Sequence, residues 1–132
     1  MSIISKIILL LSIVSMPLSA AVKPVKEVSS ERRSAVISQI LKKEPSSLLV
    51  YTKGLICKSC GIGIRKHIAK IKSVDRSRGK KGVLLDINNQ LVQVMVYGEP
   101  DTKAVAKAIR DAGYTPVKAY YKSRGKLVVK SL

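Results

Sequence analysis

The chain has 132 residues, which is room for one modest domain with additions. It carries 25 lysines and arginines against 8 acidic residues, so its formal net charge is +17. With one histidine, few carboxylates and no phosphate-binding glycine loop, the chain offers few groups for hydrolytic chemistry, and we expect no enzyme activity. So basic a surface attracts acidic partners, a class that includes nucleic acid, anionic lipid and acidic protein faces.

The first 20 residues have the layout of a cleavable secretory signal peptide. Lys6 precedes an apolar run over residues 7–16, and the small residues at 19–21 suit a signal peptidase. The alternative is an uncleaved anchor, although the run is short for a membrane span. We therefore expect a periplasmic protein, and export argues against nucleic acid as its partner.

Residues 21–47 are expected to form a leader followed by an amphipathic helix. The helix would start at Ser29 or Ser30, with Ser30 as its cap, and would stop before Pro45. Its apolar stripe comprises Val36, Ile37, Ile40 and Leu41. We expect this stripe to pack on the domain rather than to bind a partner.

Residues 48–121 alternate between strand and helix patterns. The patterns predict a strand at 48–53, a helix from Cys60 to about residue 72, and a hairpin of strands at 83–87 and 91–97 whose turn residues are Asn88 and Asn89. A second helix from about 101 to Gly113 and a strand at 114–121 follow. This β-α-β-β-α-β order predicts an α+β, ferredoxin-like sandwich: a four-stranded antiparallel sheet with both helices on one face. Residues 122–132 read as a basic tail that can add a short strand at 127–129.

The two cysteines, Cys57 and Cys60, are three positions apart. A disulfide bond between them would close a tiny loop and stabilise the fold little. A reactive or metal-binding role therefore explains the pair better than a structural disulfide does. Cys57 is expected in the loop after the first strand and Cys60 in the first turn of a helix, whose N-terminal amides favour thiolate. Two thiolates alone suit one soft ion, such as Cu(I) or Hg(II), and do not suit four-coordinate structural zinc.

Two other functions remain open for the same residues. A Cys-x-x-Cys pair at a helix start also suits a thiol–disulfide oxidoreductase. The chain could instead be a basic protein that binds surfaces or polyanions, with an incidental dithiol.

At these residues the sequence resembles the heavy-metal-associated domain family, which includes copper chaperones and the exported mercury-binding protein. The resemblance covers residues 48–121. The matching positions are Gly54, Cys57, Cys60, Ile64, Ile68, Val74 and the run Ala112-Gly113-Tyr114. The resemblance implies that Cys57 and Cys60 are the metal ligands, and that Gly54, Leu55 and Tyr114 surround them.

Several positions depart from the family pattern. Leu55 and Ile56 replace Met and a Thr or His, and Ser73 replaces a glycine at the end of the helix. Leu55 can still fill the core beneath the loop, because that role needs only apolar volume. His67 lies two helical turns from Cys60, so we expect a partly buried histidine rather than a ligand.

A carrier of this kind would act as a monomer and hand its ion to a membrane metal transporter or another metal-binding domain with an acidic docking face. An anionic membrane surface is a further partner class. The candidate docking residues are Lys58, Lys66, Arg76, Arg78, Lys80 and Lys81.

Overall fold

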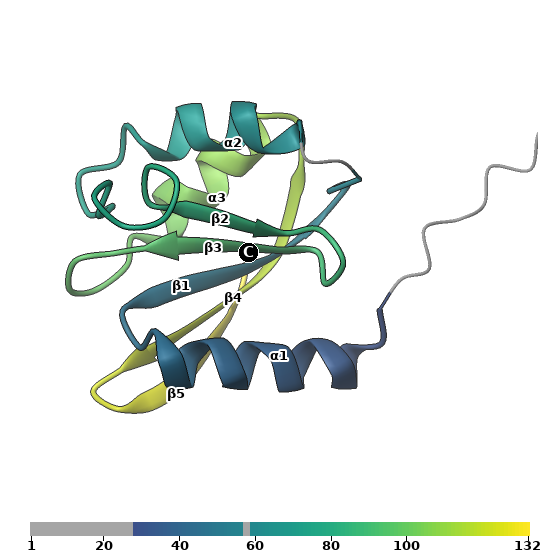
Figure 1. Cartoon of the computed structure of the whole chain (residues 1–132), viewed down its shortest axis with the longest axis vertical. Helices are drawn as coiled ribbons and strands as arrows, with labels where there is room; N and C mark the ends of the chain where they lie inside the picture. Colours follow the sequence, from purple (N-terminus) through teal and green to yellow (C-terminus); the bar gives the residue numbers. More distant parts are fainter. Residues whose placement is uncertain (1–27, 57–58) are drawn as a thin grey trace, which may run out of the picture.

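The computed structural model describes residues 28–56 and 59–132, except for the side chain of Cys60. The expected signal peptide and the leader up to residue 27 lie outside these ranges, as do Cys57 and Lys58. The described part is an α+β structure of three helices and one five-stranded antiparallel sheet (Figure 1).

The elements follow one another as the sequence patterns predict, with one strand more. They are α1 (Ser30–Lys43), β1 (Ser47–Lys53), α2 (Cys60–Ile68), β2 (Val83–Asp86), β3 (Leu91–Met95), α3 (Thr102–Asp111), β4 (Thr115–Ser123) and β5 (Lys126–Ser131). Across the sheet the strands lie in the order β2-β3-β1-β4-β5. The expectation of four strands is therefore wrong, because β5 extends the sheet beyond β4.

β5 forms because a tight turn returns the chain along β4. Arg124 and Gly125 are the only residues between the paired positions Ser123 and Lys126, and both have positive φ, at 50° and 76°. Two such residues suit a two-residue hairpin turn whose twist matches that of the strands. The segment expected as a basic tail is thus the end of β4 and an edge strand, and Val128 and Leu132 pack against the main core.

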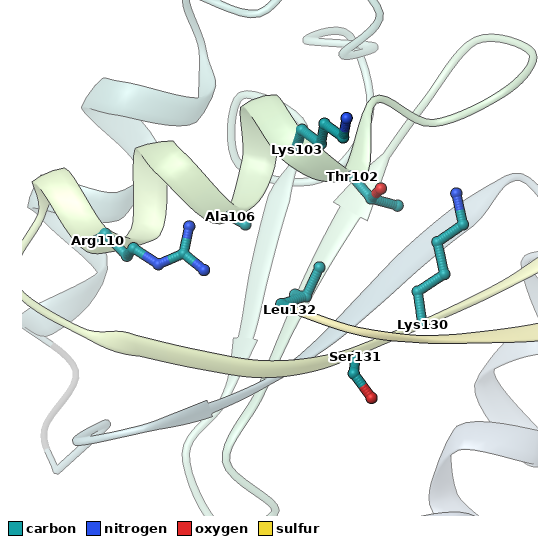
Figure 2. A pocket seen from close by; sticks show the side chains of 7 residues that line it. All are labelled: Thr102, Lys103, Ala106, Arg110, Lys130, Ser131 and Leu132. Carbon is teal, nitrogen blue, oxygen red and sulfur yellow. The ribbon is translucent and has the colours of Figure 1, made fainter.

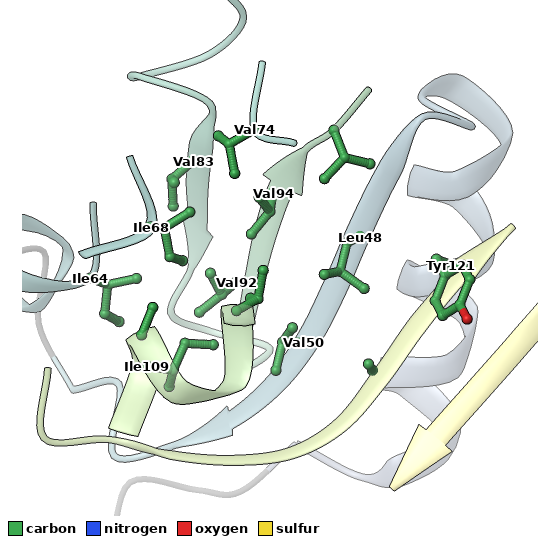
Figure 3. Packing of buried hydrophobic residues seen from close by; sticks show 14 of the residues in the cluster. Leu48, Val50, Ile64, Ile68, Val74, Val83, Val92, Val94, Ile109 and Tyr121 are labelled. Atoms are coloured by element: carbon green, nitrogen blue, oxygen red, sulfur yellow. The ribbon is translucent and has the colours of Figure 1, made fainter. Parts of the chain in front are cut away.

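The main core lies between the sheet and the pair α2 and α3, which cover the same face (Figure 1). Figure 3 shows the aliphatic side chains of α2, α3 and the central strands meeting there. In β3, Val92 and Val94 point into this core, whereas Leu91 belongs to the cluster on the other face. That alternation is the two-residue period of a strand that is covered on both sides.

Helix α1 covers the opposite face of the sheet (Figure 1). Ile37 and Leu41 are 2% and 1% exposed and pack against Leu49, Tyr51 and Leu91. The predicted packing of the α1 stripe on the domain is confirmed. The helix is capped by Ser29 rather than by Ser30, since the Ser29 hydroxyl accepts a hydrogen bond from the Arg32 amide.

Two boundaries differ from the predicted ones for local reasons. Helix α2 ends about a turn early, at Ile68, and the Arg76 guanidinium donates hydrogen bonds to the carbonyls of Ala69 and Ile71 just beyond it. In the β2–β3 turn the residue with positive φ is Gln90, at 57°. The Asn89 amide and side chain instead bind the carboxylate of Asp86, which forms the turn without positive φ at Asn89.

Candidate metal site

The loop that leads to the cysteine pair leaves β1 through a glycine. Gly54 has φ +95°, a conformation that residues with a side chain rarely adopt. A Cβ at this position would also lie 3.4 Å from Cδ1 of Tyr114, so the aromatic ring closely covers the loop backbone. Gly54 therefore fits here for two reasons: its backbone angle and the close approach of Tyr114.

Leu55 fixes the loop to the core. Its side chain is fully buried among the residues between the sheet and α2/α3. Its carbonyl accepts a hydrogen bond of 2.5 Å from Nε2 of Gln90, at the far end of the β2–β3 hairpin. The next residue, Ile56, is 69% exposed. The chain thus passes from a buried anchor to the surface within one residue, just before Cys57.

Helix α2 begins at Cys60, as the sequence predicts. Its first turn contains no acidic residue, and the amide of Ile62 donates to the carbonyl of Ser59. The amides at a helix start carry partial positive charge, which stabilises an anion such as a thiolate. The backbone of this turn is therefore suited to hold a deprotonated cysteine.

Two glycines bring the start of α2 close to its neighbours. A Cβ on Gly61 would lie 2.3 Å from Cδ1 of Leu85 in β2, a distance that real contacts do not reach. A Cβ on Gly63 would lie 3.9 Å from Cβ of Ala112, which follows α3. The first turn of α2 is therefore held between the β2 edge of the sheet and the end of α3, and its direction is set by packing.

Gly54 thus lies against Tyr114, and Leu55 and Tyr114 both pack in the main core at the start of the loop. Their place around a metal ion stays a prediction of the family resemblance. Cys57 and the side chain of Cys60 lie outside the described part of the chain, so the dithiol remains a prediction. Within the described residues, no three His, Cys, Asp or Glu side chains come together to hold a metal ion.

His67 is half-buried on α2. It contributes to a lowered pKa of Asp111, although the main cause of that shift is the hydrogen bond from Lys107.

The expected docking cations fall into two groups. Arg76 binds carbonyls beyond the end of α2, and Arg78 pairs with Glu44 after α1, so both make contacts within the protein. Lys66, Lys80 and Lys81 are exposed and line one cleft on the outer side of α2. Lys58 lies outside the described residues.

Gln90 and Gly61 were not predicted to shape the site. No local pattern marks Gln90, because the turn that contains it meets Leu55 only through the fold. Gly61 carries a weak signal, since a glycine inside a helix often marks a close approach.

Comparison with family models, with curated proteins and with solved structures finds no match for this chain. None of the helices in the described residues is long and apolar enough to cross a membrane.

Proposed function

We propose that the chain binds one soft metal ion, Cu(I) or Hg(II), between Cys57 and Cys60. The observation that carries the proposal is the anchored loop. Leu55 and Gln90 fix the chain before Cys57, and α2 begins at Cys60, so both ends of the intervening segment are held by the core. A preorganised pair of ligands loses less conformational entropy on binding than a mobile pair does.

The order of the strands supports a heavy-metal-associated type of domain. The order β2-β3-β1-β4, with α2 and α3 on one face, is what a ferredoxin-like sandwich requires. We propose that residues 48–121 form such a sandwich, to which α1 adds a second covering layer and β5 an edge strand.

The chemistry assigned to the pair is coordination without catalysis. Two thiolates meet the preference of Cu(I) or Hg(II) for few, soft ligands, and the helix start offsets their negative charge. Release to an acceptor would proceed by thiolate exchange, in which each metal–sulfur bond that forms replaces one that breaks. Tyr114 over Gly54 and the buried Leu55 limit the access of water from the core side of the loop.

The basic surface and the apolar segment at residues 7–16 support a place in the cell envelope. We propose that the protein is exported to the periplasm, where it carries or sequesters the ion and hands it to a membrane transporter or to another metal-binding domain. The chain's net charge of +17 would attract an acidic face on that partner over a distance.

Equilibrium titration of the fully reduced protein with Cu(I), and separately with Hg(II), tests the proposal. One ion per chain is expected, measured against a competing chelator of known affinity. The variant Cys57→Ser/Cys60→Ser should lose stoichiometric binding, while Ser59→Ala, between the same two positions, should keep it. Unchanged metal binding by the double serine variant would contradict the proposal.

The reduced protein and its double serine variant also test the alternative function as a thiol–disulfide oxidoreductase. The placement of Cys60 at a helix start favours that function too. A metal carrier should not reduce or oxidise a disulfide substrate catalytically. Turnover that depends on both cysteines, together with weak metal binding, would favour the redox function.

A further inference from the structure

The outer side of α2 carries two adjoining clefts that the proposed metal site does not use. The larger, of about 500 Å³, is lined by Ile62, Arg65, Lys66, Ala69, Lys80 and Lys81. The smaller, of about 300 Å³, shares Arg65 and Lys80 with it and is closed by aliphatic residues of β2 and the turn that follows. Together they form a continuous surface along α2 and the β2 edge of the sheet, which we call the α2–β2 surface.

The cations on this surface have no ion-pair partner among the residues that the structure describes. The ion pairs within the described residues join Arg78 to Glu44 and Lys107 to Asp111, and neither includes Arg65, Lys66, Lys80 or Lys81. Moreover, Nε of Arg65 is buried and has no hydrogen-bond acceptor among the described residues. Four neighbouring positive charges repel one another, and a buried donor without an acceptor is costly. An anion with oxygen acceptors would offset this repulsion and could accept a hydrogen bond from Arg65.

The α2–β2 surface also exposes large aliphatic side chains among its basic residues. Ile62, which lines the larger cleft, is 70% exposed, and Leu84, which lines the smaller one, is 37% exposed. Aliphatic side chains among lysines and arginines are typical of proteins that bind in the interfacial plane of a membrane, where apolar groups enter the acyl boundary and cations meet the headgroups. A bilayer offers both kinds of contact at every point of its surface, so it can meet the charges and Ile62 together.

The types of cation favour lipid phosphate as well. Arg65 presents a planar guanidinium that matches a phosphate in geometry, whereas the three lysines carry point charges on long, adaptable stems. Stems of this kind suit headgroups that move laterally in the bilayer. A protein partner that is recognised at fixed positions more often employs bidentate arginine pairs.

We propose that the α2–β2 surface docks the protein onto a membrane rich in anionic phospholipid. Arg65 takes a lipid phosphate, Lys66, Lys80 and Lys81 hold the surrounding headgroups, and Ile62 enters the acyl boundary. Because Ile62 lies one residue beyond Gly61 in the first turn of α2, docking brings the start of that helix to the bilayer. The docking uses neither thiol, so it does not rest on the proposed metal binding.

Another basic cleft on the molecule supplies a matched control. It lies between α3 and β5, which is at the sheet edge opposite β2, and Lys103, Arg110 and Lys130 project around it (Figure 2). These three residues are exposed, as are Lys66, Lys80 and Lys81. Replacing either set with glutamine removes the same charge from exposed positions at opposite edges of the sheet.

The test is co-sedimentation of the full chain with vesicles of equal parts phosphatidylglycerol and phosphatidylcholine, compared with phosphatidylcholine alone. Every variant carries the same N-terminal segment, and the neutral vesicles report its contribution. The variant Lys66→Gln/Lys80→Gln/Lys81→Gln should bind anionic vesicles at least about tenfold more weakly. The control Lys103→Gln/Arg110→Gln/Lys130→Gln should lose much less, and its circular dichroism and that of the first variant should match the unchanged protein.

Further variants separate the parts of the surface. Ile62→Ser should weaken binding while leaving its salt dependence unchanged, because the counterions released stay the same. Arg65→Gln should weaken binding more than any one lysine replacement. Cys57→Ser/Cys60→Ser should bind vesicles as the unchanged protein does, whatever happens to its metal binding.

Three results would overturn the proposal. An equal loss of affinity for anionic vesicles in both triple variants would show that binding depends on net charge alone. Unchanged binding by the Lys66/Lys80/Lys81 variant would place the contact elsewhere. Displacement from the vesicles by inorganic phosphate or poly-glutamate, beyond what sodium chloride causes at the same ionic strength, would assign the surface to a free anion or to an acidic protein face.

Discussion

Leu55 links the main core to the loop that precedes Cys57. Its side chain is fully buried, and its carbonyl is held by Gln90 from another part of the sheet. The sequence predicts that Leu55 packs beneath the loop, because the position needs apolar volume. It does not reveal the Gln90 contact, since a hydrogen bond across 35 positions depends on the completed hairpin.

We predict that Leu55→Ala lowers the free energy of unfolding by about 2–5 kcal/mol, because it leaves a cavity under the loop. Leu55→Met should cost less than about 1.5 kcal/mol, since the volume is nearly conserved. Urea unfolding of the two variants measures both values. Equal costs would show that Leu55 does not occupy a closely packed position.

Asp75 is one of two carboxyl groups in the described residues whose pKa is lowered. Its carboxylate accepts hydrogen bonds from the hydroxyl and amide of Ser77 and from the hydroxyl of Tyr97. The Ser77 hydroxyl is the main cause that holds the pKa of Asp75 below its usual 3.8, and Tyr97 adds to the effect. The hydrogen bonds join the loop after α2 to the end of β3.

A lowered pKa in the folded state means that ionised Asp75 stabilises the fold above its unfolded pKa, and that this stability is lost as the pH falls through the folded pKa. The protein should therefore be more stable than Asp75→Asn near neutral pH, with a difference that shrinks below the usual value of 3.8. Denaturant unfolding of both proteins from about pH 5 to pH 2 measures this difference. A constant difference across that range would contradict the assignment.

At the scale of elements, the periodicity of apolar residues locates every helix and strand of residues 48–121, but not all of their ends. The ends depend on side-chain contacts that apolar periodicity does not report, such as those that Arg76 makes just beyond α2. The full length of β5 was missed because basic residues at 122, 124, 126 and 130 resemble a solvated tail. The turn residues Arg124 and Gly125 were the available signal for a hairpin.

We predict that replacement by alanine has different effects at Val128 and Val129, although the two residues are adjacent and chemically identical. Val128 is half-buried against the main core, whereas Val129 is 51% exposed. Val128→Ala should therefore reduce the free energy of unfolding by about 1 kcal/mol, and Val129→Ala should change it by less than about 0.5 kcal/mol. Thermal or urea unfolding compares them directly, and equal effects would mean that β5 does not pack as described.

At the scale of the whole molecule, the order of elements could be read from the sequence, and it constrained the fold strongly. Which strand lies beside which, and which helix covers which face, follow from packing across the chain. Which basic side chains make polar contacts within the protein, and which do not, also depends on the fold. Arg76 and Arg78 look like Lys80 and Lys81 in the sequence, yet among these four only the arginine side chains make polar contacts with the described residues.

X-ray absorption of the one-to-one Cu(I) or Hg(II) complex reports directly on the atoms that surround the bound ion. We expect a first coordination shell of two sulfur atoms, which is lost in Cys57→Ser/Cys60→Ser. A shell dominated by nitrogen or oxygen, or a spectrum that is unchanged when both cysteines are replaced, would contradict it.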